Sequence, residues 1–156
     1  MTGVQTCALP ISTCLRHRVQ LLTELGDAQA VLEAADEAFE RATATSSISN
    51  QILILTARAQ AWLQLDQNHA ALNDTTQAIR LLESGSGMRE AFTEGVRWVH
   101  AQALSANERH GEAKIELEKA RAEAQVRLEQ LHDPQWREAF LNMPINQALF
   151  TKNQNV

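Results

Sequence analysis

The sequence predicts an all-α fold built from paired helices. Apolar residues make up 44% of the 156 residues, aromatic residues only 4%, and Tyr is absent. Most of the apolar content is therefore Ala and Leu, which favour closely packed helices over a β core. From about residue 13 onward, apolar residues recur at steps of three and four, the period of an amphipathic helix. The three Pro and six Gly stand almost entirely between these periodic segments.

Turn signals divide the periodic region into six helices. Gly26-Asp27 combines a helix-ending glycine with a good N-cap. Thr45-Ser46-Ser47, Asp66-Gln67-Asn68, Gly85-Ser86-Gly87 and the stretch from 107 to 111 supply the other breaks. The last of the six helices is the longest, and its stripe of Ala and Leu is suited to burial. Its other face carries the i, i+4 pairs Lys114–Glu118, Lys119–Glu123 and Glu123–Arg127, and this pattern is typical of a solvated face.

The segment after the sixth helix predicts a separate cap. Asp133-Pro134 is a strong restart signal, because it places an N-cap Asp before Pro at the first helical position. The following residues include Trp136, Phe140, Leu141, Leu149 and Phe150. We therefore expect a C-terminal capping helix over 133–150 that covers the open end of the helix array, followed by a frayed tail over 151–156.

The helices recur as pairs. Before each turn within a pair lies a small or branched residue, with a large apolar residue three positions later: Val19 and Leu22, Ala59 and Trp62, Ala101 and Leu104. After each turn comes a triplet at steps of four and three: Val31-Ala35-Ala38, Ala71-Thr75-Ala78, Ala113-Leu117-Ala120. The period is 40 residues from Leu22 to Trp62 and 42 from Trp62 to Leu104. Small residues let two helices approach closely, and stacking of about three pairs buries the apolar faces that one pair leaves open.

This pattern resembles the tetratricopeptide repeat, in which a small residue and an aromatic residue lie in the first helix and Ala recurs in the second. Ala59, Trp62, Ala71 and Ala78 carry the likeness best, whereas the period is longer than the usual 34 and Val31 replaces an Ala. The resemblance implies a right-handed α-solenoid of about three helix-turn-helix repeats plus the capping helix, with a repeat domain over 13–150. Its units are expected at about 13–45, 48–84 and 88–131. The tail from Asp133 is similar to the closing segment of such arrays in bacterial multidomain signalling proteins (LuxR-type regulators of the maltose-activator kind and signalling ATPases).

The N-terminal segment over 1–12 differs from the rest of the chain. It has no helical period and contains Pro10. It resembles the translated sequencing-adapter peptide GVQTCALPI, which implies that these residues are not native and that the chain is a fragment of a larger protein. The alternative interpretation is an ordinary disordered terminus. In either case Cys7 is left out of every functional argument.

Composition and motifs argue against several classes of function. A net charge of −5 disfavours nucleic acids and anionic membranes as partners. No apolar run is long enough to span a bilayer and no secretory signal is present, so a cytoplasmic setting is expected. No catalytic motif, metal-ligand spacing or phosphate loop occurs, so we expect no enzyme activity, cofactor or metal. The carboxylates of Glu116 and Glu118 are expected to face solvent. The histidines are expected at the surface or its boundary: His17, His69, His100, His110 and His132.

The resemblance implies that the first helix of each pair lines a concave groove. Projection of the groove positions gives Arg16, Gln20 and Thr23 from the first unit, Thr56, Gln60 and Gln64 from the second, and Trp98, Gln102 and Ser105 from the third. We expect a protein or peptide segment as the partner, with self-association through the N-terminal edge as a further expectation. The alternative is a domain that senses a small-molecule effector in an apolar pocket near Trp98.

Overall fold

The computed structural model describes residues 11–84 and 93–151. Residues 1–10, 85–92 and 152–156 lie outside this description. The adapter-like peptide, the Gly85-Ser86-Gly87 break, the expected start of the third unit at 88 and nearly all of the expected frayed tail therefore lie outside the described residues. Residues 11 and 12, which were assigned to the non-native segment, belong to the first helix.

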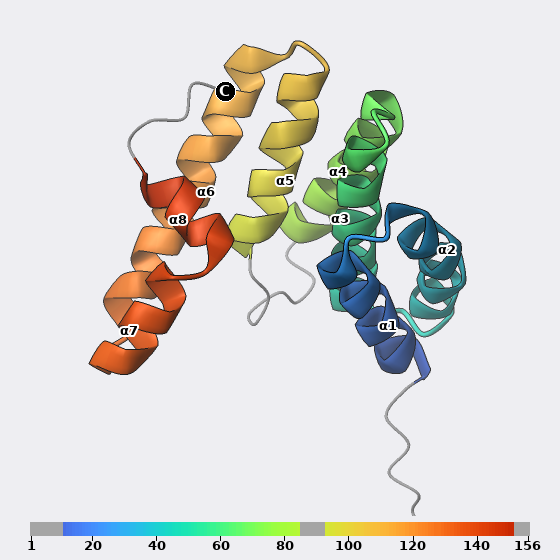
Figure 1. The fold of residues 1–156 in the computed structure, drawn as a ribbon, viewed down its shortest axis with the longest axis horizontal. Helices are drawn as coiled ribbons and strands as arrows, with labels where there is room; N and C mark the ends of the chain where they lie inside the picture. The colour runs from blue at the N-terminus through green and yellow to red at the C-terminus, as the bar shows by residue number, and fades with distance from the viewer. Residues whose placement is uncertain (1–10, 85–92, 152–156) are drawn as a thin grey trace, which may run out of the picture.

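The described residues form helices and no strand, which confirms the all-α class. Figure 1 labels them in chain order. The helices are α1 (Ile11–Leu25), α2 (Ala28–Ala44), α3 (Ile48–Gln64), α4 (Asn68–Glu83), α5 (Thr93–Ala106), α6 (His110–Gln130), α7 (Pro134–Leu141) and α8 (Pro144–Phe150).

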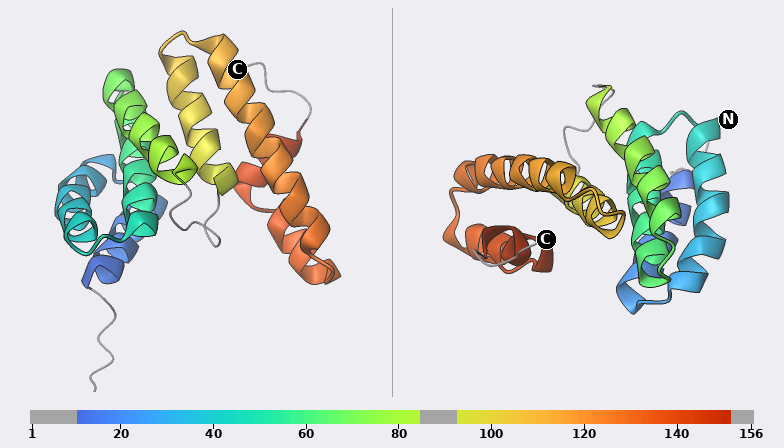
Figure 2. Two further views of the ribbon diagram at one scale, coloured as in Figure 1. Left: turned by 180° about the vertical axis from the view of Figure 1, so that it is seen from behind. Right: turned by 90° about the horizontal axis from the view of Figure 1, so that it is seen from above.

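The first six helices pack as consecutive hairpins: α1 with α2, α3 with α4, and α5 with α6. Each later hairpin inserts its first helix against both helices of the preceding one, so that α3 contacts α1 and α2, and α5 contacts α3 and α4. Figures 1 and 2 show the result as an arch, with α1 to α4 in one limb and α5 to α8 in the other. The first helices of the hairpins line the inner side of this arch.

The turns between consecutive helices share one backbone design. Four residues adopt a left-handed conformation, namely Gly26 (φ 73°), Ser46 (52°), Asp66 (57°) and Glu108 (61°). In each turn this residue donates its N–H to the carbonyl three positions earlier, and the next residue donates to the carbonyl five positions earlier. This pair of bonds is the Schellman motif, which ends a helix and satisfies its last carbonyls. The turn positions inferred from sequence near residues 26, 66 and 108 are therefore confirmed as helix ends.

Alanine fills the sites of closest approach between helices. Ala35, Ala38, Ala59, Ala78 and Ala120 have no exposed surface. All nine residues of the three predicted triplets are buried, as are the small or branched residues predicted before each turn. The expected interhelical contacts are thus confirmed, and a larger side chain at any of these positions would force the helices apart.

The C-terminal cap consists of two short helices rather than the single helix that was expected. Pro144 begins α8 after Asn142 has ended α7, and a proline inside one continuous helix would break its hydrogen bonding. α8 packs on α6, and Figure 2 shows both short helices along one side of that limb. Arg121 donates to the Leu149 carbonyl at 2.8 Å, which ties α8 to α6. Trp136 was expected to cover the array but is 68% exposed, because it lies on the outer side of α7.

The left-handed Glu108 gives a first test of these turns. A residue with a Cβ pays about 1–2 kcal/mol in this conformation, whereas glycine does not. We expect Glu108→Gly to raise the free energy of unfolding by about 1 kcal/mol, measured by urea denaturation. Lys114→Gly, at an exposed position inside α6, is the control and should lower it by about 1 kcal/mol. A decrease in both variants would contradict the assignment.

Candidate binding groove

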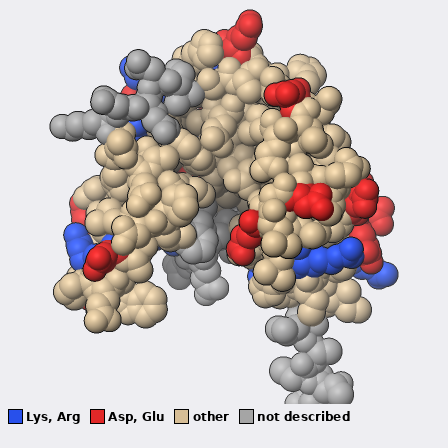
Figure 3. Space-filling model, viewed as in Figure 1, with Lys and Arg blue, Asp and Glu red and all other residues tan. Residues whose placement is uncertain are grey.

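The inner side of the arch holds a half-open groove of about 520 Å³. Three first helices and one cap helix supply its lining. α1 contributes Arg16, Val19, Gln20, Thr23 and Glu24; α3 contributes residues from Ser49 to Gln60; α5 contributes Gly95, Val96 and Val99; and α8 contributes Ile145. Figure 3 shows this face hollowed between the two limbs, with a surface that is mostly uncharged.

The floor of the groove is apolar because the same residues belong to the helix-packing core. Val19 and Ile54 are buried in the cluster that joins α1, α2 and α3, and Val99 is buried in the cluster that joins α3, α4 and α5. Leu53 and Ile145 are only partly buried and face the open side. A ligand would therefore meet rigid aliphatic surface on one side and polar side chains at the borders.

On α1 the polar groups satisfy one another along the helix. Arg16 donates from Nη1 to Gln20 Oε1 at 3.2 Å, and Gln20 donates from Nε2 to Glu24 Oε1 at 3.3 Å. Partial burial lowers the pKa of Arg16 below its ordinary value, although a guanidinium of this kind remains protonated at neutral pH. Among the described residues that line the groove, Arg16 and Glu24 carry the charged side chains.

On α3, two side-chain amides at the groove are available to a ligand. Within the described part of the chain, neither Asn50 nor Gln60 makes a side-chain hydrogen bond, and both line the groove. Thr56 differs, since its hydroxyl donates to the Ile52 carbonyl at 2.8 Å and keeps only acceptor capacity for a ligand. Two unpaired amides beside an apolar floor are suited to the backbone N–H and C=O groups of a bound chain.

The structure brings five of the nine predicted site residues together. Arg16, Gln20, Thr23, Thr56 and Gln60 all line the groove. The other four, Gln64, Trp98, Gln102 and Ser105, lie outside its lining. The groove follows the first half of α5, where Gly95, Val96 and Val99 line it. Gln102 and Ser105 lie nearer the end of α5, and Trp98 lies between Val96 and Val99 but outside the lining.

Packing explains why the α5 positions differ. Trp98 is half-buried against two core clusters, one toward α3 and α4 and the other toward α6 and the cap. It fills space between hairpins and offers no face to the groove. Ser105 is the penultimate residue of α5, and its Oγ is 3.3 Å from His110 Nδ1. Gln64 and Gln102 are exposed to solvent beyond the groove.

Sequence reasoning missed the apolar part of the site. Leu53 of α3, Val96 and Val99 of α5, and Ile145 of the cap line the groove although the sequence analysis did not assign them to it. The sequence carried a signal for Leu53, which precedes Thr56 and Gln60 on one face of α3 at helical spacing. No local pattern places Ile145, since its position depends on how the cap folds back.

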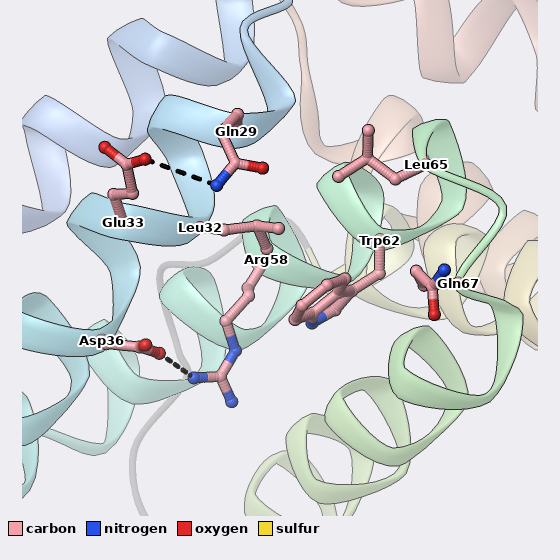
Figure 4. A pocket seen from close by; sticks show the side chains of 8 residues that line it. All are labelled: Gln29, Leu32, Glu33, Asp36, Arg58, Trp62, Leu65 and Gln67. Carbon is pink, nitrogen blue, oxygen red and sulfur yellow. Dashed lines mark hydrogen bonds and ion pairs between the residues drawn. The ribbon is translucent and has the colours of Figure 1, made fainter.

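A second, shallower pocket of about 440 Å³ lies between α2 and α3 on another face. Figure 4 shows that Arg58 dominates it and points toward Asp36. Arg58 donates to both carboxylate oxygens of Asp74 at 2.7 Å and to Asp36 at 2.8 Å, and its guanidinium lies 5.6 Å from the centre of the Phe39 ring. These contacts, with the Asp74 hydrogen bond first, raise the pKa of Arg58. Arg58 thus joins α2, α3 and α4, and it has little capacity left for a ligand.

A comparable ion network lies between α4, α5 and α6. Arg97, which is buried, contacts Glu116 at 2.8 Å, Glu123 at 2.7 Å and Glu83 at 3.4 Å. The expectation that Glu116 faces solvent is therefore wrong, and Lys119 and Glu123 pair with Glu116 and Arg97. The sequence signal was Arg97 itself, a charge flanked by Val96, Trp98 and Val99 in an apolar helix. Such a buried charge needs partners, and the adjacent face of α6 supplies them.

His100 is also buried, which corrects its placement at the surface or its boundary. Its Nδ1 lies 2.9 Å from Thr75 Oγ1. The Thr75 hydroxyl already donates to the Ala71 carbonyl at 3.0 Å, so geometry assigns the proton to His100 Nδ1. Burial is the main cause that lowers the pKa of His100, and a nearby Glu116 opposes it.

Other types of site are not found in the described ranges 11–84 and 93–151. No group of three or more His, Cys, Asp or Glu is placed to hold a metal ion there. Cys14 is a free, exposed thiol. None of the helices described combines the length and the apolar character needed to cross a bilayer.

Comparison of the chain with protein-family models, curated proteins and solved structures found no match. Its residues and their geometry are therefore the basis for any assignment of function.

The Arg58 junction predicts a large loss of stability. Arg58→Met leaves the carboxylate of Asp74, which is 7% exposed, without its counter-ion. We expect the free energy of unfolding to fall by about 3 kcal/mol in chemical denaturation. Arg18→Met, at the equivalent but exposed position of α1, is the matched control and should change it by less than about 0.5 kcal/mol. Equal effects of the two substitutions would show that the junction contributes little.

His100 predicts the sign of one contribution to pH dependence. Because its pKa is lowered in the folded state, the unfolded chain binds the proton more readily. The contribution of neutral His100 to stability is fully present above the pKa of the unfolded chain, about 6.5. It is lost as pH falls through the lower pKa of the folded state. We expect His100→Asn to flatten the decline in urea midpoint between about pH 7.5 and 5. The exposed His132→Asn should leave the decline unchanged, and an effect of the same size there would contradict the assignment.

Proposed function

We propose that the chain is a protein–protein interaction module that binds a polypeptide segment in the groove between α1, α3 and α5. One observation carries the proposal: five of nine side chains chosen from the repeat pattern line a single groove with an apolar floor. The concave shape of the groove also agrees with the proposal, because arrays of helix pairs present extended concave surfaces to their partners. We expect this groove to bind a partner rather than to catalyse a reaction, since the charged groups among its described lining residues are Arg16 and Glu24.

The finer description of the fold belongs to the same proposal. The three hairpins share left-handed turn residues and one equivalent buried alanine (Ala38, Ala78 and Ala120), and this supports three tetratricopeptide-like repeats in a right-handed α-solenoid. The cap helices α7 and α8 complete the array. We further propose that the module is part of a larger bacterial signalling or transcriptional regulator with a cytoplasmic setting, where it acts as a scaffold or sensor. The support for this parent is the sequence resemblance alone.

The bound segment is expected to carry little charge. The groove offers aliphatic surface from Leu53, Val96 and Val99 and open amides from Asn50 and Gln60. Apolar side chains of a peptide would bury against the floor, and its backbone would exchange hydrogen bonds with the amides. Among the described residues of the lining, a nucleic acid would find no basic stripe and no aromatic side chain to stack on, and the cation there is the partly buried Arg16.

A small-molecule effector is the second candidate for the same groove. Its volume of about 520 Å³ lies within the range of ligand pockets, and it combines an apolar floor with a few polar groups. We do not propose an effector site near Trp98, because Trp98 lies outside the lining of the groove. Thermal-shift screening of metabolites tests this candidate, because a ligand that binds only the folded chain raises the melting temperature further as its free concentration increases above the dissociation constant.

The peptide proposal predicts different effects of two glutamines. We expect Gln60→Ala to weaken a bound peptide about tenfold, because the peptide group it contacts would lose a hydrogen bond in a partly buried site. Gln102→Ala removes the same amide from an exposed site outside the groove and should leave affinity within about twofold. A peptide selected from a random library on the wild-type chain would be titrated by fluorescence anisotropy against each variant. Equal affinities for all three chains would refute the groove assignment.

A further inference from the structure

Three positions on the outer face of α1 are exposed, although the same positions are buried or half-buried where they recur on α3 and α5. Cys14, Arg18 and Leu21 correspond to Ile54, Arg58 and Ala61 on α3, by the shift of 40 residues between the first two hairpins. Leu21 is 60% exposed and Cys14 is exposed, whereas Ile54 has no exposed surface and Ala61 only 3%. The shift of 42 residues leads on α5 to Val96, His100 and Ala103, which are all buried.

The preceding hairpin is what buries these positions. Ile54 and Ala61 pack in the same cluster as Val31 and Ala35, which belong to α2. Ala103 packs with Ala59 and Ala71 from the second hairpin. α3 contacts both α1 and α2, and α5 contacts both α3 and α4, so each edge is covered by two helices at once.

A polar contact accompanies the packing at both junctions. Arg58 binds Asp36 on α2 at 2.8 Å, and His100 lies 2.9 Å from Thr75 on α4. Arg18 has no ion-pair partner among residues 11–84 and 93–151. Its own hairpin provides no carboxylate, because Ala34 stands at the position that Asp74 holds in the second hairpin.

We propose that this edge, formed by Ile11, Cys14, Arg18, Leu21 and Leu25, docks an α-helical hairpin that carries small residues and a carboxylate opposite Arg18. The bound hairpin would pack on α1 in the way that the α1–α2 hairpin packs on α3. Its two helices would bury the aliphatic side chains, and its carboxylate would take the place of Asp36 at the first junction. This surface lies on a different face of α1 from the groove and is independent of the proposed function.

A second copy of the chain fits the edge less well. Arg18 stands at the middle of the exposed stripe, so two antiparallel α1 helices related by two-fold symmetry would bring the two Arg18 side chains together. The other end of the array does not offer a free face either, because α8 covers α6. A separate hairpin with an acidic residue satisfies both the shape and the charge of the edge.

The test supplies such a hairpin within the full chain. A second copy of residues 11–50 is inserted before Ile11, so that Ile11 follows the inserted Asn50 as Gln51 follows Asn50 in the natural chain. The short connection gives the inserted hairpin a high effective concentration at the edge. Cys7→Ser is made in all chains and Cys14→Ser in the inserted copy, which leaves the natural Cys14 as the single thiol.

Alkylation of Cys14 by iodoacetamide reports whether the edge is covered. We expect the reaction to be about tenfold slower or more in the extended chain than in the Cys7→Ser chain of natural length, because the thiol then occupies the buried position of Ile54. An unchanged rate in an extended chain whose helix content has risen by one hairpin would overturn the proposal.

Two variants of the inserted copy test the carboxylate. Asp36→Ala there should restore several-fold faster alkylation and lower the urea midpoint, while Glu40→Ala, one turn further along the same helix, should change neither. Arg18→Ala in the natural α1 should have the effect of Asp36→Ala, and the two together should add little. Equal effects of Asp36→Ala and Glu40→Ala would overturn the charge-matched docking.

The chain of natural length distinguishes the other occupants. If alkylation of Cys14 slows as protein concentration rises and sedimentation shows a dimer, the edge pairs with a second copy and the proposal is wrong. It is also wrong if deletion of residues 1–10 makes Cys14 react faster, because that segment would then be the occupant. Fast alkylation that is independent of both concentration and the deletion is the result expected for a vacant docking edge.

Discussion

Close approach of helices at alanine is the constraint on which this structure depends. Ala35, Ala38, Ala59, Ala78 and Ala120 are fully buried, and each lies where a helix meets its neighbour. Small side chains at these positions let neighbouring helices pack closely, and a larger side chain there would push them apart. The direction of the array, the inner side of the arch and the groove along α1, α3 and α5 all follow from this contact. Large residues such as Trp62 and Trp98 then fill the wider spaces between hairpins.

Charged residues hold the junctions in register where alanine alone would allow sliding. Arg58 and Arg97 each reach two neighbouring helices and each contact at least two carboxylates. A buried ion pair contributes little net stability compared with an apolar pair, but its geometry tolerates few alternative arrangements. Apolar packing therefore supplies the binding energy between hairpins, while the two arginines restrict how the hairpins can be placed. Both networks lie away from the groove, and the groove keeps its neutral lining.

The sequence was sufficient to predict the helices and much of their packing, but it predicted the residues of the groove less well. Turns could be located because Gly26, Asp66 and Glu108 interrupt a strong helical period, and the triplets such as Val31-Ala35-Ala38 identified buried faces. The projected residues of α1 line the groove, as do Thr56 and Gln60 of α3 but not Gln64. The projected residues of α5 do not, because the crossing of helices decides which part of α5 borders the inner side. Charge patterns on a single helix misplaced Glu116, since its partner Arg97 lies on another helix. Long-range partners of this kind leave only a weak trace in local periodicity.

Ile145 gives the cap a second consequence beyond covering α6. As this side chain of α8 borders the groove, a molecule held there touches both the hairpins and the cap. Occupancy of the groove and docking of the cap are then linked equilibria, and any effect of one on the other is reciprocal and equal in free energy. The strength with which α8 is attached to α6 would therefore depend on whether the groove is filled.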